Sequence, residues 1–313
     1  RSTWEEKVAA AVPREPPVHY VNVGANKGYN AVGFLNLWTE ARIKKMRWHA
    51  LIMEYAVEQN LTRSLHVKHP LALQGIVACG ACKACRDGMP AEHERRGGVA
   101  SLLDLNPRNS ALLRWLTART ELSPVASAFN VYNLGASNAS ASVVVRDDKM
   151  LGAEDLSIAT RLGRHSRQAV PIVRLDDWHD TRTTDRPYTI DRPYHVAIDT
   201  EGWDALVIEG MRGALADRRV AILEFEYSGK GYWQPRSRKD ARNLEETVRW
   251  LGGAGYRCYW QGRDDLIPAS PPCWRPSFEM RKWSNLVCAH EPPVLDVLDG
   301  IARRGYKRRQ RRQ

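Results

Sequence analysis

The fold is decided by residues 18–30, which read VHYVNVGANKGYN. The part from Val18 to Val23 is rich in β-branched and aromatic residues and predicts a buried strand. A short glycine turn follows, and residues 29–37 then carry apolar side chains at helical spacing, which predicts a helix. A strand, a glycine turn and a helix in this order are typical of the first unit of a nucleotide-binding α/β sheet.

Outward from this unit, strands and helices alternate along most of the chain, which predicts a Rossmann-like, doubly wound, mainly parallel sheet. Further strands are expected at 99–105, 129–134, 143–145, 170–175, 195–198 and 220–223. Helices are expected at 106–116, 206–215 and 241–251. Residues 257–260 and 285–289 are expected to close the sheet as an antiparallel pair.

The length of 313 residues suits one large α/β domain, which we place at residues 1–302. Residues 39–98 interrupt the alternation after the first helix and are interpreted as an insertion. Residues 303–313 are expected to form a basic, disordered tail. No stretch approaches the roughly 18 uncharged apolar residues of a membrane span. The chain begins at Arg1, and the sequence assigns neither a compartment nor an oligomeric state.

The net charge of +11 is concentrated at the end of the chain. Removing the last eleven residues, which hold seven basic side chains and no acid, lowers the net charge from +11 to +4. A basic tail is more often a solvated end than a specific reader of nucleic acid. We therefore expect no nucleic-acid partner, and keep a nucleic-acid enzyme that uses the tail as an alternative.

The glycine turn is the first candidate binding element. Gly24 and Gly28 bound it, and glycine lets the backbone approach a ligand closely at positive φ. The turn reads GANKG and lacks the G-x-G-x-x-G pattern of a dinucleotide site, which favours a smaller adenosine cofactor over NAD. A purely structural turn is the alternative.

An acidic residue that ends the second strand is the next expected part, because it can accept hydrogen bonds from both ribose hydroxyls. Asp104 lies at the end of an apolar run and before a helix, and it is preferred to Glu54, which no fresh turn follows. After the next strand come Ala136 and Ser137, two small residues that leave room for an adenine face.

Two carboxylates, Asp199 and Glu201, follow the buried strand 195–198 and are the candidate catalytic residues. Acids at this position can orient an acceptor hydroxyl, take its proton or help to bind a metal, although we assign no metal ligand here. Glu201 can instead favour the start of the next helix. His195 is a weaker candidate base, and Glu224 and Glu226 either shape the same cleft or are solvated at the sheet edge.

In the order and type of its motifs the chain resembles the FkbM family of methyltransferases. The resemblance rests on VGANKGYN at 23–30, LDLNP at 103–107, RLDD at 174–177, IDTEG at 198–202, IEG at 208–210 and LEFE at 223–226. It implies a class I methyltransferase fold, S-adenosylmethionine as methyl donor, and O-methylation of a sugar, a glycan or another hydroxylated small molecule. A non-catalytic binding protein with this fold is a further alternative.

Carried over residue by residue, the resemblance implies roles for the candidate residues. The methionine part of the cofactor would lie at Asn22, Gly24, Ala25, Asn26 and Gly28, the ribose at Asp104, and the acceptor at Asp199 and Glu201. Asn22 stands where the family commonly has aspartate, and Leu105 replaces a common proline. The long insertion with clustered cysteines is similar to algal-type members of the family.

Three of the six cysteines, Cys79, Cys82 and Cys85, lie at C-x-x-C-x-x-C spacing within the insertion. This spacing is compatible with a structural zinc site completed by His93 or by a distant cysteine. The six cysteines can instead form disulfides in an oxidising compartment, or remain free thiols.

Overall fold

The computed structural model describes residues 3–12, 17–39, 41–59, 97–119, 128–146, 167–178, 193–234, 240–262 and 265–310. The chain divides into two compact units, and the single domain expected over residues 1–302 stays a prediction. Unit 1 comprises Arg1–Glu15, Ala136–Ala139 and Val173–Gln313, and unit 2 comprises Pro16–Gly135 and Ser140–Ile172.

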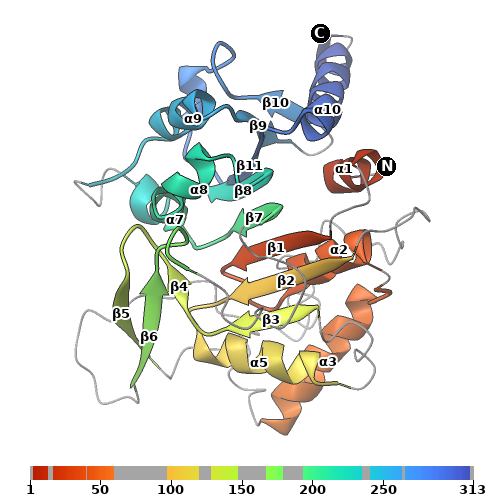
Figure 1. Ribbon diagram of the computed structural model, residues 1–313, viewed down its shortest axis with the longest axis vertical. Helices are drawn as coiled ribbons and strands as arrows, with labels where there is room; N and C mark the ends of the chain where they lie inside the picture. Colours follow the sequence, from red (N-terminus) through yellow and green to blue (C-terminus); the bar gives the residue numbers. More distant parts are fainter. Residues whose placement is uncertain are drawn as a thin grey trace. The chain divides into compact units, whose positions relative to one another are not determined.

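Unit 2 contains the strand, glycine turn and helix predicted from residues 18–30. Its three parallel strands follow the order β1-β2-β3 (Figure 1). In this register Val23 of β1 lies opposite Leu103 of β2. A separate antiparallel pair, β5 and β6, also belongs to this unit. The elements are β1 (Val18–Val23), α2 (Tyr29–Trp38), α3 (Lys45–Glu58), β2 (Gly98–Leu103), α5 (Pro107–Thr117), β3 (Phe129–Tyr132), β5 (Ala141–Arg146) and β6 (Arg167–Val173). The two-residue strand β4 (Gly135–Ala136) lies at the boundary of the units.

Helix α3 falls within the region that the sequence assigned to an insertion, yet it belongs to the core of unit 2. Trp48, Leu51 and Ile52 on this helix are fully buried. Its 14 residues lack a side-chain N-cap, so burial of the apolar face is the main source of its stability. Residues 60–96, which include the predicted zinc ligands Cys79, Cys82 and Cys85, lie outside the described residues.

Unit 1 joins a parallel strand pair to antiparallel strands, in the order β7-β8-β11-β9-β10. The predicted antiparallel pairing of residues 257–260 with 285–289 is confirmed. The elements are α1 (Trp4–Ala11), β7 (His195–Ile198), α7 (Asp204–Glu209), α8 (Arg212–Ala216), β8 (Ile222–Tyr227), η5 (Gly231–Trp233), α9 (Leu244–Gly253), β9 (Arg257–Gln261), β10 (Leu266–Pro268), η6 (Pro276–Phe278), β11 (Ser284–Ala289) and α10 (Pro292–Gln310). Parallel strands separated by helices confirm the predicted α/β class.

Strand β8 is longer than the sequence predicted. The apolar run 220–223 suggested that the strand ends at Glu224, but it continues to Tyr227. Glu224 and Glu226 therefore lie within the strand rather than after it, and both point to the same face because strand side chains alternate. Strand β8 pairs with β11 on one side and with β7 on the other, and this pairing holds Glu224 and Glu226 within the sheet.

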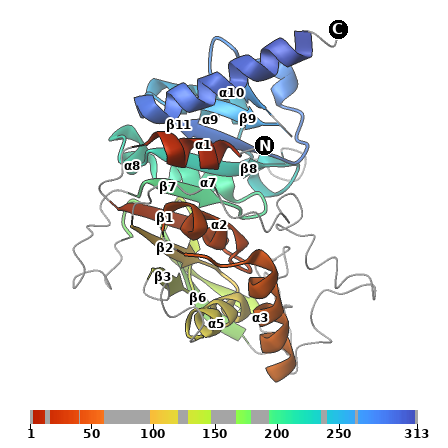
Figure 2. The ribbon, with the colours of Figure 1, turned by 90° about the vertical axis from the view of Figure 1, so that its right-hand side faces the viewer.

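Residues 303–310 are helical, contrary to the disorder predicted for the basic tail, and residues 311–313 lie outside the described residues. Helix α10 runs from Pro292 to Gln310, and Figure 2 shows α1 lying beside it. Its apolar side chains Leu298 and Ile301 are buried, and Arg309 forms an ion pair with Asp265. Tertiary packing of one apolar face thus orders a segment whose charge alone indicated disorder.

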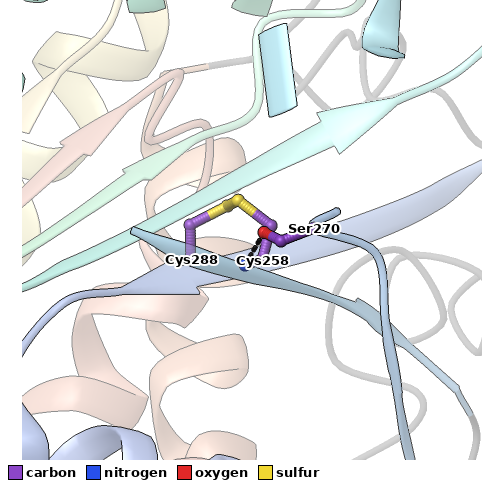
Figure 3. The surroundings of a disulfide bond; sticks show 3 residues. All are labelled: Cys258, Ser270 and Cys288. Carbon is purple, nitrogen blue, oxygen red and sulfur yellow. Dashed lines mark hydrogen bonds between the residues drawn. A yellow bond between two sulfur atoms is a disulfide. The ribbon is translucent and has the colours of Figure 1, made fainter. Parts of the chain in front are cut away.

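Two of the six cysteines form a disulfide. Cys258 on β9 lies directly opposite Cys288 on β11, and their sulfur atoms are bonded (Figure 3). The Ser270 hydroxyl accepts a hydrogen bond from the Cys258 backbone N–H at 2.8 Å. Cys273 is a free, exposed thiol. Of the three alternatives for the cysteines, namely disulfides, a zinc site and free thiols, the disulfide is the one that Cys258 and Cys288 adopt.

Among the described residues, no helix combines the length and the apolar character that crossing a membrane requires.

Gly210 separates α7 from α8, where the sequence predicted one helix over 206–215. A Cβ atom at this position would lie 1.9 Å from the Ser137 carbonyl oxygen, so no side chain fits without a backbone shift. The structure therefore requires glycine here.

We expect Gly210→Ala to lower the free energy of unfolding by about 1 to 3 kcal/mol or more, because overpacking against backbone has to be relieved. Chemical denaturation measures this change. Gly252→Ala in α9 is the matched control, since a Cβ there meets no atom within 4 Å. It should stabilise the chain by about 0.5 to 1 kcal/mol. Equal effects of the two substitutions would contradict the packing at Gly210.

Candidate functional site

The glycine turn of unit 2 has the backbone conformation that its glycines suggested. Gly24 and Gly28 have φ values of 80° and 76°, a region that side chains disfavour. A Cβ at Gly28 would lie 2.8 Å from the Leu113 side chain. The indole Nε1 of Trp48 donates a hydrogen bond to the Lys27 carbonyl at 2.8 Å. The region predicted to be an insertion thus supplies a support for the turn.

Asp104 directly follows β2 beside this turn, the position predicted for it, whereas its role at a ribose stays a prediction. Glu54 lies on α3 and pairs with Arg47. The buried Asp104 carboxylate accepts hydrogen bonds from the backbone N–H groups of Asn26 at 2.6 Å and of Asn106 at 2.7 Å. It therefore fixes the turn, a role that the sequence did not predict. The predicted residue Ala25 is buried in the same turn.

Burial governs the charge of Asp104. Desolvation raises the pKa of its carboxyl group to about 6, although hydrogen bonds from Asn106, Asn26 and Asn109 and the charge of Lys27 lower it. The buried Lys27 and the amide of Asn109 are neighbours that the sequence analysis missed. Only the spatial closeness of turn and strand end brings them to this carboxylate.

Asn22, on β1, carries an unsatisfied polar group. It is 1% exposed, and neither its Nδ2 nor its Oδ1 atom has a hydrogen-bond partner. An unsatisfied buried amide costs about 1 to 3 kcal/mol, a cost that a bound ligand or an ordered water would remove. Asn22 lies two residues before Gly24, at the end of the strand that feeds the turn.

Ala136 and Ser137, the residues predicted to lie at an adenine face, belong to unit 1, whereas the turn belongs to unit 2. Both are buried. The Ser137 backbone N–H donates a hydrogen bond to the Val173 carbonyl at 2.9 Å. The Ser137 carbonyl packs against Gly210, the residue that follows α7.

The predicted acids Asp199 and Glu201 follow β7 in unit 1 and gather with Glu226 of β8. One carboxylate oxygen from each residue lies within 4.8 Å of the others. The parallel register pairs Ile198 with Phe225, and its continuation by one position aligns Asp199 with Glu226. We call these three residues the three-carboxylate cluster. The spacing of acids in LEFE was the sequence signal for Glu226, but the register was needed to use it.

Asp204 is a further acid of this region, which the sequence analysis missed. It is completely buried at the start of α7. Its carboxylate accepts hydrogen bonds from the Thr200 hydroxyl at 3.0 Å, the Gly202 N–H at 3.1 Å and the Glu226 N–H at 3.2 Å. Desolvation and repulsion by Glu226 raise its pKa to about 7.

Crowding of acids also governs Asp199. Desolvation by the surrounding protein, followed by repulsion from Glu226, Asp204 and Glu201, raises the pKa of its carboxyl group well above the usual value. The Asp199 side chain is exposed to solvent, and the negative charges of its neighbours disfavour its ionised form. A carboxylate with a raised pKa is a stronger base than an ordinary one.

Glu201 is held differently. Its φ of 55° lies in the left-handed region, which costs a residue other than glycine about 1 kcal/mol or more. Its Oε2 atom accepts a hydrogen bond from the Lys230 ammonium group. Next to it, a Cβ at Gly202 would lie 2.4 Å from the Lys230 carbonyl oxygen. The turn after β7 is therefore tightly packed against the segment after β8.

The weaker candidates His195 and Glu224 face each other instead of joining the cluster. His195 Nε2 lies 3.5 Å from Glu224 Oε2, and the histidine ring packs edge-on against Trp4. Gln261 donates to Glu224 Oε1 at 2.6 Å. These contacts fit a His195 side chain that packs within unit 1 better than one that acts as a base.

No family model and no curated protein matches the sequence. Among solved structures, the chain is similar to the methyltransferase FkbM from Methylobacillus flagellatus KT, with a TM-score of 0.42 and 13% sequence identity. The similarity covers 87% of this chain and 43% of that chain, so this chain spans less than half the length of that protein.

The pKa of Asp104 has a consequence for stability. In the unfolded chain the carboxyl group titrates near its ordinary value of 3.8, and in the folded chain near 6. Protonation thus favours the folded state, and this stabilisation is lost as the pH rises through 6. Between pH 5 and pH 8 the loss amounts to about 1.4 kcal/mol for this group.

We expect the unfolding free energy of the unaltered chain to fall between pH 5 and pH 8 by about 1.4 kcal/mol more than that of Asp104→Asn. Urea denaturation at the two pH values gives both differences, and the lost hydrogen bonds of the variant do not affect its pH slope. The exposed Asp217→Asn serves as control and should keep the original slope. Equal slopes for all three proteins would show that Asp104 titrates near its ordinary value.

Proposed function

We propose that this chain is an S-adenosylmethionine-dependent methyltransferase that methylates a hydroxyl group of a sugar, a glycan or another small molecule. The observation that carries the proposal is the unsatisfied, buried amide of Asn22 at the strand end that leads into the glycine turn. The motif resemblance to the FkbM family supports the same conclusion.

Asn22 fits the methionine part of this cofactor. Its Oδ1 can accept a hydrogen bond from an ammonium group, and its Nδ2 can donate one to a carboxylate. An amino acid moiety offers both partners side by side, so a single ligand would satisfy both orphaned atoms. The neutral amide suits such a zwitterion where the family commonly has a charged aspartate.

The second part of the cofactor site is Asp104. Its carboxylate offers about four lone-pair positions, of which the Asn26 and Asn106 N–H groups take two at short distance. The remaining positions, which Asn109 approaches at 3.3 and 3.4 Å, suit a ribose hydroxyl. In this proposal Asp104 both holds the turn and orients the ribose.

The chemistry demands little beyond alignment and the removal of one proton. S-adenosylmethionine carries the methyl group on a positively charged sulfur. This sulfur is a good leaving group, because it becomes neutral when the methyl group is transferred. The chain has to hold an acceptor oxygen in line and accept its proton. We assign the base to Asp199, whose pKa is raised, and the orientation of the acceptor hydroxyl to Glu201, which Lys230 holds in place.

The cofactor assignment is tested at Asn22. We expect calorimetry to detect binding of S-adenosylmethionine but not of NAD, and Asn22→Leu to weaken that binding by about 10- to 100-fold, as for the loss of buried hydrogen bonds. The same substitution should raise the unfolding free energy, because it removes an unsatisfied buried amide.

Asn36→Leu is the matched control for this test. The Asn36 amide exchanges two hydrogen bonds with Ile43, at 2.7 and 2.8 Å, and is buried like Asn22. Its replacement should lower stability and leave cofactor affinity unchanged. Cofactor binding by Asn22→Leu at full strength would remove the main support for the proposal.

The assignment of the base is tested by the separate substitutions Asp199→Asn and Glu201→Gln. Each amide keeps the shape but removes the charge, so cofactor affinity should persist. Turnover on a verified acceptor should fall by roughly 10² or more for Asp199→Asn if it is the base, and less for Glu201→Gln. Full turnover of both variants would exclude these carboxylates from the proton transfer.

A further inference from the structure

The three-carboxylate cluster has the composition of a site for a hard cation. Asp199, Glu201 and Glu226 each offer one carboxylate oxygen, and the three oxygens lie within 4.8 Å of one another. Oxygen ligands on opposite sides of a bound Mg²⁺ or Ca²⁺ ion are about 4 to 5 Å apart, and adjacent ones are closer. The spacing therefore allows all three oxygens to bind one ion after small side-chain movements.

Glu226 gives an independent indication of a ligand. The residue is 5% exposed, and its Oε2 atom accepts a hydrogen bond from the indole Nε1 of Trp283 at 2.8 Å. Its Oε1 atom is buried and has no hydrogen-bond partner. A buried carboxylate oxygen without a donor is costly, and either a bound cation or a proton shared with the neighbouring Asp199 carboxyl group would satisfy it.

We propose that the three-carboxylate cluster binds one hard divalent cation of the Mg²⁺ or Mn²⁺ class. All three ligands are carboxylates from a turn and a neighbouring strand, which favours ions that prefer oxygen over those that prefer sulfur or imidazole. Three protein ligands leave positions of an octahedral ion open to water and to one further oxygen.

Backbone hydrogen bonds to Asp204 hold the segments that carry the three carboxylates in fixed positions. Asp204 binds the Gly202 N–H of the turn and the Glu226 N–H of β8. The turn that carries Asp199 and Glu201 is thereby fixed to the strand that carries Glu226. Metal sites need such second contacts to keep their ligands in place.

Lys230 is the competitor of the ion. Its ammonium group contacts Glu201 Oε2 and places one positive charge beside the cluster. The Lys230 side chain is 59% exposed, so it can move away when a divalent ion enters. Removal of its charge should accordingly strengthen ion binding, since like charges repel.

The use of the ion rests on the proposed methyl transfer, whereas its binding does not. An acceptor hydroxyl on an open position of the ion would lose its proton more easily and would be held in a fixed orientation. The carboxylates would then hold the ion, and the released proton would pass to the Asp199 carboxylate oxygen that does not bind the ion.

Titration of the whole chain with MnCl₂, followed by calorimetry and by the electron paramagnetic resonance of free Mn²⁺, tests the proposal without cofactor or acceptor. We expect one Mn²⁺ per chain, competed by Mg²⁺. Glu226→Gln and Asp199→Asn should each weaken binding at least tenfold, Lys230→Met should strengthen it, and the exposed Asp217→Asn should leave it unchanged.

Absence of stoichiometric Mn²⁺ binding, or equal binding by Asp199→Asn, overturns the proposal. Asp199→Asn decides the matter if Glu226→Gln does not fold, because the Asp199 side chain is exposed. Binding by Lys230→Met alone also overturns it, since Lys230 would then be the native cation of the cluster. A separate titration with S-adenosylmethionine distinguishes the two proposals: a chain that binds Mn²⁺ but no cofactor refutes the methyltransferase and keeps the ion site.

Discussion

The geometry of the acidic site depends on one fully buried carboxylate, that of Asp204. It accepts hydrogen bonds from the Thr200 hydroxyl and the Gly202 N–H, both in the turn after β7, and from the Glu226 N–H in β8. A buried carboxylate without such donors would be too costly to keep. With them, it fixes the end of one parallel strand to its neighbour.

This constraint produces the unusual electrostatics of unit 1. Because the turn is fixed against β8, Asp199 and Glu226 remain close although their charges repel each other. Desolvation, together with this repulsion, raises the pKa of Asp199, and a proton or a cation relieves the repulsion. Residues with strongly perturbed pKa values are often found at functional sites, because catalytic acids and bases need pKa values matched to their task.

In unit 2 a buried aspartate likewise joins two chain segments by accepting backbone hydrogen bonds. Asp104 follows a parallel strand, is buried, and binds the Asn26 N–H in the turn after the neighbouring strand β1. In both units an aspartate beyond a strand end joins two chain segments through backbone N–H groups. The difference lies in the surroundings, because Asp104 has the cation Lys27 nearby and Asp204 has a further carboxylate.

The sequence by itself determined the parts that follow from local patterns. Periodicity and turn residues predicted strand β1, the glycine turn, α2, the position of Asp104 after the second strand and the pairing of β9 with β11.

Tertiary structure decided what depends on residues far apart. The register of β7 and β8 brought Glu226 to Asp199, and the packing of α10 ordered a basic end that its charge made look disordered. Strand pairing also selected Cys258 and Cys288 as a disulfide, a choice that six cysteines leave open. Register and packing are set by the sum of many distant contacts, so no short stretch of sequence carries them.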